Sequence, residues 1–259
     1  MRTNKVIFRS MEKKIVGEIN LPDKFSGKLP TVILFHGLTN TRKDCPLIDE
    51  TAKTLTENGF IAFRFDFYGS GESAGYLKDK TIDILEQNAE DAIKFICQNS
   101  LVDSERIGIW GRSIGGTVAC LLPRDKKIKT RVIASGAVMF EKTFKPAYLK
   151  LKKKETELEK VGQKLPGTGD YKGVYLLGKQ WFKSLAGIDK KIYENLKKLD
   201  TILVLGTAKD QKVSIDNACL ILNTVKEPKR IWIYPADHDY AGVEKQAIEE
   251  TVRWFKRYL

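Results

Sequence analysis

Six short stretches of the chain are almost continuously apolar, and segments with helical spacing lie between several of them. The six stretches are Val32–Gly37, Phe60–Phe67, Arg106–Gly111, Arg131–Ala137, Ile202–Thr207 and Arg230–Pro235. Strands that are apolar on both faces are typical of a parallel sheet covered by helices on both sides. The pattern therefore predicts an α/β protein with a mostly parallel central sheet flanked by helices.

Three further segments complete this outline. Apolar residues recur at three- and four-residue spacing in 82–96 and again in 243–258, which predicts an amphipathic helix in each segment. The first twenty residues contain two strand-like stretches, KVIFRS and KKIVGEIN, on either side of Met11–Glu12. This arrangement predicts an antiparallel hairpin at the edge of the sheet.

One region, 141–187, interrupts the alternation of strands and helices. It has no strand-like apolar stretch, and it holds eleven lysines against five acidic residues. It contains a helix-like segment at 150–161, a turn at 165–170 and an aromatic-bearing segment at 175–185. We interpret it as a cap inserted into a single domain, 1–259, and lying over the sheet.

Length and composition exclude several classes of protein. The 259 residues suffice for one large domain, and no apolar stretch approaches the length of a membrane span. Charged residues interrupt the N-terminus, so we expect no signal peptide and a cytoplasmic location. The four cysteines are far apart and lack the spacing of metal ligands, which favours reduced thiols and no metal site.

The net charge of +12 raises the question of an anionic partner. The lysine-rich stretch Lys150–Lys160, however, mixes both signs of charge and contains no aromatic residues. This composition favours a solvated helix face, and no nucleic-acid recognition motif accompanies it. We therefore expect no nucleic acid as partner.

The stretch IGIWGRSIGG, at 107–116, places Ser113 between glycines two positions away on each side. It matches the G-x-S-x-G nucleophile elbow, with a strand before the serine and a helix of small residues after it. The backbone N–H of Ile114 then lies at the positive end of a helix, where an oxyanion would form. A tight turn that merely contains a serine is the alternative interpretation.

A serine nucleophile needs a base, and the chain contains two histidines. His238 follows the apolar stretch 230–235 on a loop that can reach the carboxyl edge of the sheet, where sites of α/β proteins are built. Taken alone, it could equally be an exposed loop histidine. His36 ends the stretch 32–37, and we expect it to shape the loop that follows.

The third member of such a site is an acid, and Asp210 lies three residues beyond a strand-like stretch. Serine, acid and histidine then follow one another in the order used by hydrolases of this architecture. Asp210 would fix the tautomer of His238, which takes the serine proton. Asp210 could instead be a turn or N-cap residue. Asp237 and Asp239 are less favoured acids, because neighbours of a histidine seldom fold back onto its ring.

The stretch FHGLTNT, at 35–41, supplies the remaining part of the site. A glycine after the first central strand allows the loop to expose its N–H groups. The backbone N–H groups of Leu38 and Ile114 would together form the oxyanion hole.

These segments together resemble the α/β-hydrolase superfamily, and within it serine esterases similar to bacterial cinnamoyl (feruloyl) esterases and monoacylglycerol-lipase-like hydrolases. The resemblance covers nearly the whole chain through FHGLTNTRKD, NGFIAFRFDFYGSGESAG, SERIGIWGRSIGG, LGTAKDQKV and YPADHDY. It implies an α/β-hydrolase fold with a small cap after the sixth strand, and it implies no cofactor and no metal. The implied triad and oxyanion donors are Ser113, Asp210 and His238, with Leu38 and Ile114.

The resemblance also assigns structural positions and shows two departures. In the family, RFDFYGSGES is a scaffold segment, so Asp66, Gly69 and Gly71 are expected to be structural. Arg112 stands before the serine where many relatives have histidine, and Tyr240 stands where phenylalanine is frequent. We expect neither departure to take part in the work of the triad.

The cap is the weakly matched part of the chain, and caps shape the substrate pocket in this superfamily. Trp181, Phe182 and Tyr175 are candidate pocket walls, or else they only pack the cap onto the body. The expected function is hydrolysis of short-to-medium acyl or aryl esters through an acyl-enzyme. A small-molecule ester is the expected partner, and the sequence does not decide whether the chain forms a homodimer.

Two classes of alternative function remain at this stage. The same triad serves thioesterases, aminopeptidases and acyltransferases, and an aminopeptidase would need acids in its pocket to bind the substrate amino group. Glu155, Glu157 and Glu159 are acids of the cap. The other alternative is a catalytically idle binding protein of the same fold.

Overall fold

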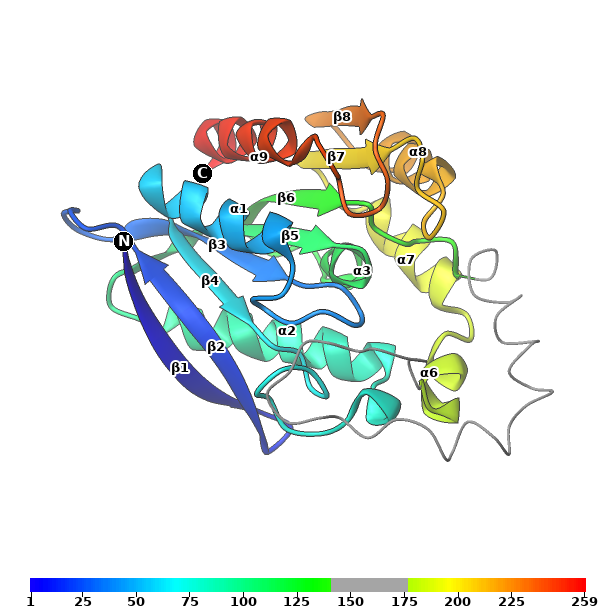
Figure 1. Cartoon of the computed structure of the whole chain (residues 1–259), viewed down its shortest axis with the longest axis horizontal. Coiled ribbons are helices and arrows are strands. Elements are labelled where there is room, and N and C mark those ends of the chain that lie inside the picture. Colours follow the sequence, from blue (N-terminus) through cyan, green and yellow to red (C-terminus); the bar gives the residue numbers. More distant parts are fainter. Residues whose placement is uncertain (141–176) are drawn as a thin grey trace.

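The computed structural model describes residues 1–140 and 177–259, which form one eight-stranded sheet with helices on both faces (Figure 1). The strands are β1 (Arg2–Ser10), β2 (Lys13–Leu21), β3 (Leu29–Phe35), β4 (Ile61–Phe65), β5 (Val102–Arg112), β6 (Ile128–Ala134), β7 (Ile202–Thr207) and β8 (Lys229–Tyr234). The helices are α1 (Pro46–Glu57), α2 (Ile82–Cys97), α3 (Ile114–Leu121), α6 (Lys179–Ser184), α7 (Ile188–Leu196), α8 (Ile215–Thr224) and α9 (Glu244–Tyr258), with a 3-10 turn, η1 (Leu77–Asp79).

The strands lie in the order β1-β2-β4-β3-β5-β6-β7-β8. The N-terminal hairpin is antiparallel and pairs with β4 in the antiparallel sense. All other neighbours are parallel. The predicted mostly parallel sheet with a hairpin at its edge is therefore confirmed.

Four strands end earlier than the apolar pattern predicts: β4 ends at Phe65 and β8 at Tyr234, and the early ends of β3 and β6 have a physical cause. The predicted stretch 32–37 ends as a strand at Phe35, because the polar groups of the next two residues bond within the loop. The predicted stretch 131–137 ends at Ala134, because Ser135 has a φ of 46°, which no strand residue adopts. Both ends lie at the edge of the sheet where loops turn away.

The hydrophobic core has two layers, one on each face of the sheet. Alternation along β3 sends Ile33 and Phe35 into one layer and Val32 and Leu34 into the other. Helices α2, α3, α7 and α8 cover the first layer, and α1 and α9 cover the second. Complete burial of each large apolar side chain contributes roughly 1.5–3 kcal/mol, so the layers hold the strand ends in fixed positions.

Only the end of the predicted insertion, 177–187, falls within the described residues. There α6 packs beside η1, and the N–H of Gly178 donates to the carbonyl of Lys78 at 3.2 Å. Three features predicted for the insertion lie outside the described residues: the helix at 150–161, the turn at 165–170 and Tyr175. The assignment of 141–187 as a cap stays a prediction.

Candidate active site

The candidate residues follow strands whose carboxyl ends share one edge of the sheet. Ser113 follows β5 directly, Asp210 lies three residues after β7, and His238 lies four residues after β8. The chain passes from β3 outward to β4 but from β5 to β6 in the opposite direction. The loops after β3 and β5 therefore flank a topological switch point, where ligands of open α/β sheets bind.

Ser113 occupies a strained turn between β5 and α3. Its φ of 55° and ψ of −121° lie outside the regions that residues with side chains favour. Such a conformation costs about 1–3 kcal/mol and persists only where the surroundings enforce it. The N–H of Ser113 donates to the carbonyl of Ala134 at 2.9 Å, which ties the turn to β6.

The two glycines of the motif allow this turn to form. A Cβ on Gly111 would collide with the carbonyl of Gly115, and a Cβ on Gly115 would collide with the carbonyl of Phe35. The backbones at Gly111, Gly115 and Phe35 approach one another so closely that only glycine fits at positions 111 and 115. The predicted sequence of strand, serine turn and helix is present.

The amide of Leu38 is directed by its neighbours in the β3 loop, residues 36–45. The carbonyl of Gly37 accepts from Nδ1 of His36 at 2.6 Å and from the N–H of Asn40 at 3.2 Å. In a trans peptide the N–H points opposite to the carbonyl, so the N–H of Leu38 points away from these two donors. Ile114, the first residue of α3, presents its N–H at the positive end of that helix.

His36 shapes the β3 loop, as the sequence predicts. Its Nε2 accepts from the N–H of Phe67 at 3.0 Å, so the proton resides on Nδ1, which donates to Gly37. Burial, together with the positive charge of Lys80, lowers the pKa of His36 to about 4. The ring is therefore neutral at pH 7 and engaged at both nitrogens.

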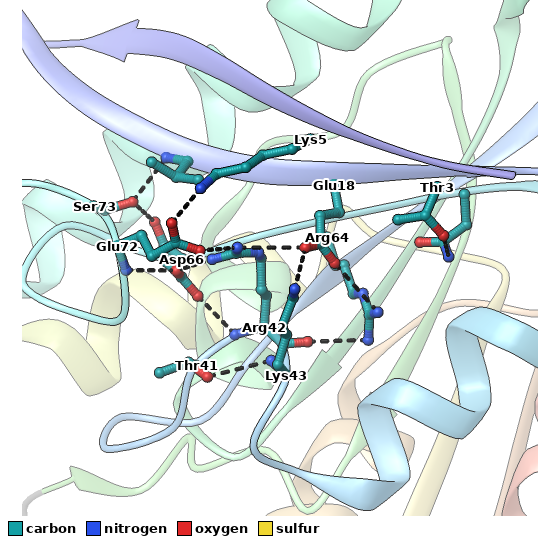
Figure 2. A network of polar contacts seen from close by, with 12 residues as sticks. Thr3, Lys5, Glu18, Thr41, Arg42, Lys43, Arg64, Asp66, Glu72 and Ser73 are labelled. Atoms are coloured by element: carbon teal, nitrogen blue, oxygen red, sulfur yellow. Dashed lines mark hydrogen bonds and ion pairs between the residues drawn. The ribbon is translucent and has the colours of Figure 1, made fainter. Parts of the chain in front are cut away.

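A buried network of ion pairs anchors the β3 loop to the sheet (Figure 2). Arg42 pairs with Asp66 and also donates its backbone N–H to that carboxylate at 2.8 Å. Both side chains are almost completely buried. Glu18, Glu72 and Arg64 extend the network, which we call the Arg42 network. The predicted structural role of Asp66 is confirmed.

Asp210 and His238 are hydrogen-bonded, with 2.7 Å between the carboxylate Oδ2 and the ring Nδ1. The Asp210 side chain is fully buried, and that of His238 is 8 % exposed. Burial acts to raise the pKa of Asp210, but the bonds from His238 and from the N–H groups of Val213 and Lys212 outweigh it and lower the pKa. An ionised carboxylate can only accept, so this hydrogen bond requires a proton on Nδ1 of His238.

Asp210 also serves as the turn residue that the sequence offered as an alternative. Its Oδ1 accepts from the N–H groups of Lys212 and Val213, each at 2.8 Å. The two roles use different oxygens, and the turn bonds fix the direction in which Oδ2 faces His238.

The two other candidate acids bind elsewhere. Asp237 accepts the N–H groups of Asp239 and Ala241, at 3.0 and 3.2 Å, and so forms the turn. Asp239 pairs with Arg112 and lies 3.5 Å from Nζ of Lys212. Among the three candidates, Asp210 is the one that contacts the histidine ring.

The two departures from the family pattern both hold the β8 loop, residues 235–243. Arg112 donates to the backbone carbonyl of His238 at 3.0 Å. Tyr240 is completely buried and donates its hydroxyl to the carbonyl of Leu205 at 2.8 Å. Arg112 thus contacts the backbone of His238, whereas Tyr240 contacts β7. The expectation that neither departure takes part in the work of the triad stays a prediction. The available signal for the Arg112 contact was a charged residue directly after the stretch Arg106–Gly111, which is predicted to be a buried strand.

Sequence reasoning also missed a lysine that supports the β3 loop. Lys80 is 1 % exposed, and its Nζ donates to the carbonyl of Leu38 at 2.8 Å and to Oγ of Ser70 at 2.6 Å. Its position in a charged, loop-like segment gave no sign of this burial.

The candidate pocket walls are placed only in part. Trp181 is fully buried in the core layer beneath α6, and Phe182 packs partly buried against the same layer. Tyr175 lies outside the described residues. Within 1–140 and 177–259, no group of three or more His, Cys, Asp and Glu residues is arranged to hold a metal ion, and no helix is apolar and long enough to cross a bilayer.

The comparisons with known proteins agree with the fold. A ferulic-acid complex of Est1E from Butyrivibrio proteoclasticus superposes with a TM-score of 0.79 at 18% identity and covers 98% of both chains. An uncharacterized 31.7 kDa protein of the traX-finO intergenic region of Escherichia coli is 32% identical over 103 residues, 39% of this chain and 35% of its own. A thiohydrolase, aneE, of Aspergillus aculeatus is 32% identical over 122 residues, 45% of this chain and 36% of its own.

The matches to curated relatives are partial, whereas the family match is broad. The chain spans about a third to a half of the length of the curated relatives it matches. The model of the hydrolase family described as serine aminopeptidase, S33, matches residues 28–176, which include the β3 loop and Ser113 and end before Asp210. This match covers more than half of the chain, and the sheet has the corresponding architecture. The chain belongs to this family of α/β hydrolases.

Proposed function

We propose that this hydrolase cleaves carboxylic esters with short-to-medium acyl or aryl groups through an acyl-enzyme on Ser113. One observation carries the proposal, the hydrogen bond between Asp210 and His238 at the sheet edge where Ser113 occupies its strained turn. The esterases among the structural neighbours, such as the acetyl xylan esterase from Paenibacillus, support an ester as the substrate.

The first half of the reaction forms the acyl-enzyme. Oγ of Ser113 attacks the ester carbonyl carbon while Nε2 of His238 takes its proton, and Asp210 stabilises the imidazolium. The N–H groups of Leu38 and Ile114 donate to the oxyanion of the tetrahedral intermediate. The bond to the alcohol oxygen then breaks, and His238 returns the proton to the leaving alcohol.

The second half releases the acid. Water gives a proton to Nε2 of His238 and adds its oxygen to the acyl carbon. The bond from that carbon to Oγ of Ser113 breaks, and the proton moves from His238 to the serine oxygen. The carboxylic acid leaves, and the site returns to its starting state.

The test compares the native chain with Ser113→Ala on p-nitrophenyl acetate, butyrate and octanoate. Removing the nucleophile from a serine triad lowers kcat by a factor on the order of 10⁶, so we expect near-complete loss with an unchanged thermal midpoint. Equal rates in both proteins would refute the proposal. If neither protein hydrolysed the esters above background, an idle binding protein of this fold would be favoured.

A thioester is the second candidate substrate, because the thiohydrolase from Aspergillus aculeatus is 32% identical over the matched segment. The family description raises the aminopeptidase alternative, for which the candidate acids of the cap lie outside the described residues. Rates on a butyryl thioester and on an aminoacyl p-nitroanilide, measured beside p-nitrophenyl butyrate, distinguish the three. Preference for either competitor over the ester would replace the proposed substrate class and leave the triad assignment in place.

A further inference from the structure

The side chain of Arg112 lies between two loops that are far apart in the sequence. Its guanidinium is 3 % exposed. Nη1 donates to Oδ1 of Asn40 at 3.3 Å and lies 3.4 Å from Sγ of Cys45. Nη2 donates to the backbone carbonyl of His238 at 3.0 Å and to the carboxylate of Asp239. Arg112 therefore contacts both the β3 loop and the β8 loop.

The backbone of Arg112 has a fixed position. It is the last residue of β5 and pairs with Ala134 of β6 in the centre of the sheet. Ser113 follows it directly, so the guanidinium and the serine share one rigid attachment. Asn40, in turn, lies against Gly37, where a Cβ would stand only 2.6 Å from its Oδ1.

We propose that Arg112 is a positioning residue, which holds His238 and the β3 loop in register with Ser113. This inference rests on the proposed function, because it concerns the same site. An arginine suits the task, since its planar fork of donors keeps fixed directions and can bind two loops at once. A lysine would keep the charge, but its single nitrogen lacks the two separate donor groups with which Arg112 binds Asn40 and the carbonyl of His238.

Asp239 compensates the charge of the buried guanidinium. Burial acts to raise the pKa of Asp239, but the positive charges of Arg112 and Lys212 outweigh it and lower the pKa. Asp239 is therefore ionised at neutral pH. Charge compensation alone does not explain the other contacts, because Asn40 and the carbonyl of His238 are neutral acceptors.

The test compares Arg112→Lys with a matched variant, Arg131→Lys. Arg131 is 2 % exposed and donates to the carbonyls of Leu122 and Pro123, at the end of α3 opposite to Ser113. A misplacement of about 1 Å in a catalytic group costs about 10²-fold in rate, so we expect that loss in kcat on p-nitrophenyl butyrate for Arg112→Lys, with KM unchanged. We expect Arg131→Lys to keep the native kcat, whatever it loses in thermal midpoint.

A second readout is independent of turnover. The chain has two histidines, so labelling histidine with ¹³C at Cε1 gives two ring signals, one from His36 and one from His238. In Arg112→Lys we expect the signal of His238 to shift or broaden while that of His36 stays in place. In Arg131→Lys we expect both signals at their native positions.

The outcomes separate this inference from the proposed function. If the native chain is an active esterase and Arg112→Lys matches it in kcat and in the His238 signal, the positioning role is refuted. An equal loss of kcat in both lysine variants would also refute it, because the effect would then be one of buried arginines in general. If the native chain neither hydrolyses esters nor reacts at Ser113 with a fluorophosphonate, the proposed function is refuted and the positioning role with it.

Discussion

Two buried polar regions lie at neighbouring places in this fold, and they are built differently. In the Arg42 network, several charges of both signs satisfy one another, and Arg42 alone pairs with Asp66, Glu18 and Glu72. In the candidate active site, one carboxylate faces one ring nitrogen, Nδ1 of His238. The first region joins several charges into one buried network, and the second is a single pair at the sheet edge that carries Ser113.

The difference also appears in the backbone. The Arg42 network attaches the β3 loop, which also carries Leu38, to the sheet. The candidate site contains positive φ values at Ser113 and Tyr240, 55° and 64°. Strain of this kind concentrates at functional sites. We therefore expect changes in the Arg42 network to reduce stability and changes in the candidate site to reduce rate.

Among the changes that test this division, the largest effect is expected for Asp210→Asn. The amide can no longer stabilise the imidazolium or enforce a proton on Nδ1 of His238, and the corresponding change in a serine protease lowers kcat by about 10⁴. We expect a loss of this order on p-nitrophenyl butyrate with little change in urea unfolding. Asp237→Asn is the matched control, because that carboxylate bonds backbone N–H groups and should leave kcat near native. Equal losses in both variants would break the comparison.

The next effect is expected for Arg42→Met, which leaves Asp66 buried without its cation. Removing one partner of a buried ion pair typically costs about 3–5 kcal/mol in unfolding free energy, measurable by urea titration. Arg253→Met provides the control, because its side chain is 65 % exposed and exposed pairs contribute about 0–1 kcal/mol. We expect the folded Arg42→Met protein to retain more activity than Asp210→Asn. If Arg42→Met lost as much kcat as Asp210→Asn while its unfolding free energy stayed near native, the division between the two regions would be contradicted.

The smallest effect concerns His36 and depends on pH. Its pKa falls from 6.5 to about 4 on folding, so between these values the unfolded chain binds a proton that the folded chain does not. Stability therefore falls as the pH drops through this window, by up to about 1.4 kcal/mol per pH unit. We expect His36→Gln to lose this component of the slope in urea titrations at pH 7, 6 and 5. If the unfolding free energy changes with pH equally in the native chain and the variant, the pKa of His36 does not change on folding, which would contradict this prediction.

Much of the fold could be predicted because burial on both faces leaves a simple sequence pattern. The stretch 202–207 became β7 with the predicted bounds, since its residues are buried along the whole strand. The pair of Asp210 and His238 could be proposed because the chain has two histidines, and Asp210 is an acid that follows a strand and lies between Ser113 and His238 in the sequence.

What could not be predicted depends on contacts between distant residues. Arg112 meets the carbonyl of His238 across 126 positions, and no local pattern encodes such a bond. The burial of Lys80 likewise follows from the loop that folds over it. The early end of β6 depends on the backbone of Ser135, whose residue type gives no sign of a positive φ.

The central claim is that Ser113 is the nucleophile, and covalent labelling tests it most directly. The native chain is incubated with a fluorophosphonate probe, and the adduct is located by intact mass and peptide mapping. The account predicts one label per chain, on Ser113, absent in Ser113→Ala and slow to form in Asp210→Asn. An unlabelled native chain, or a label on another serine, would contradict it.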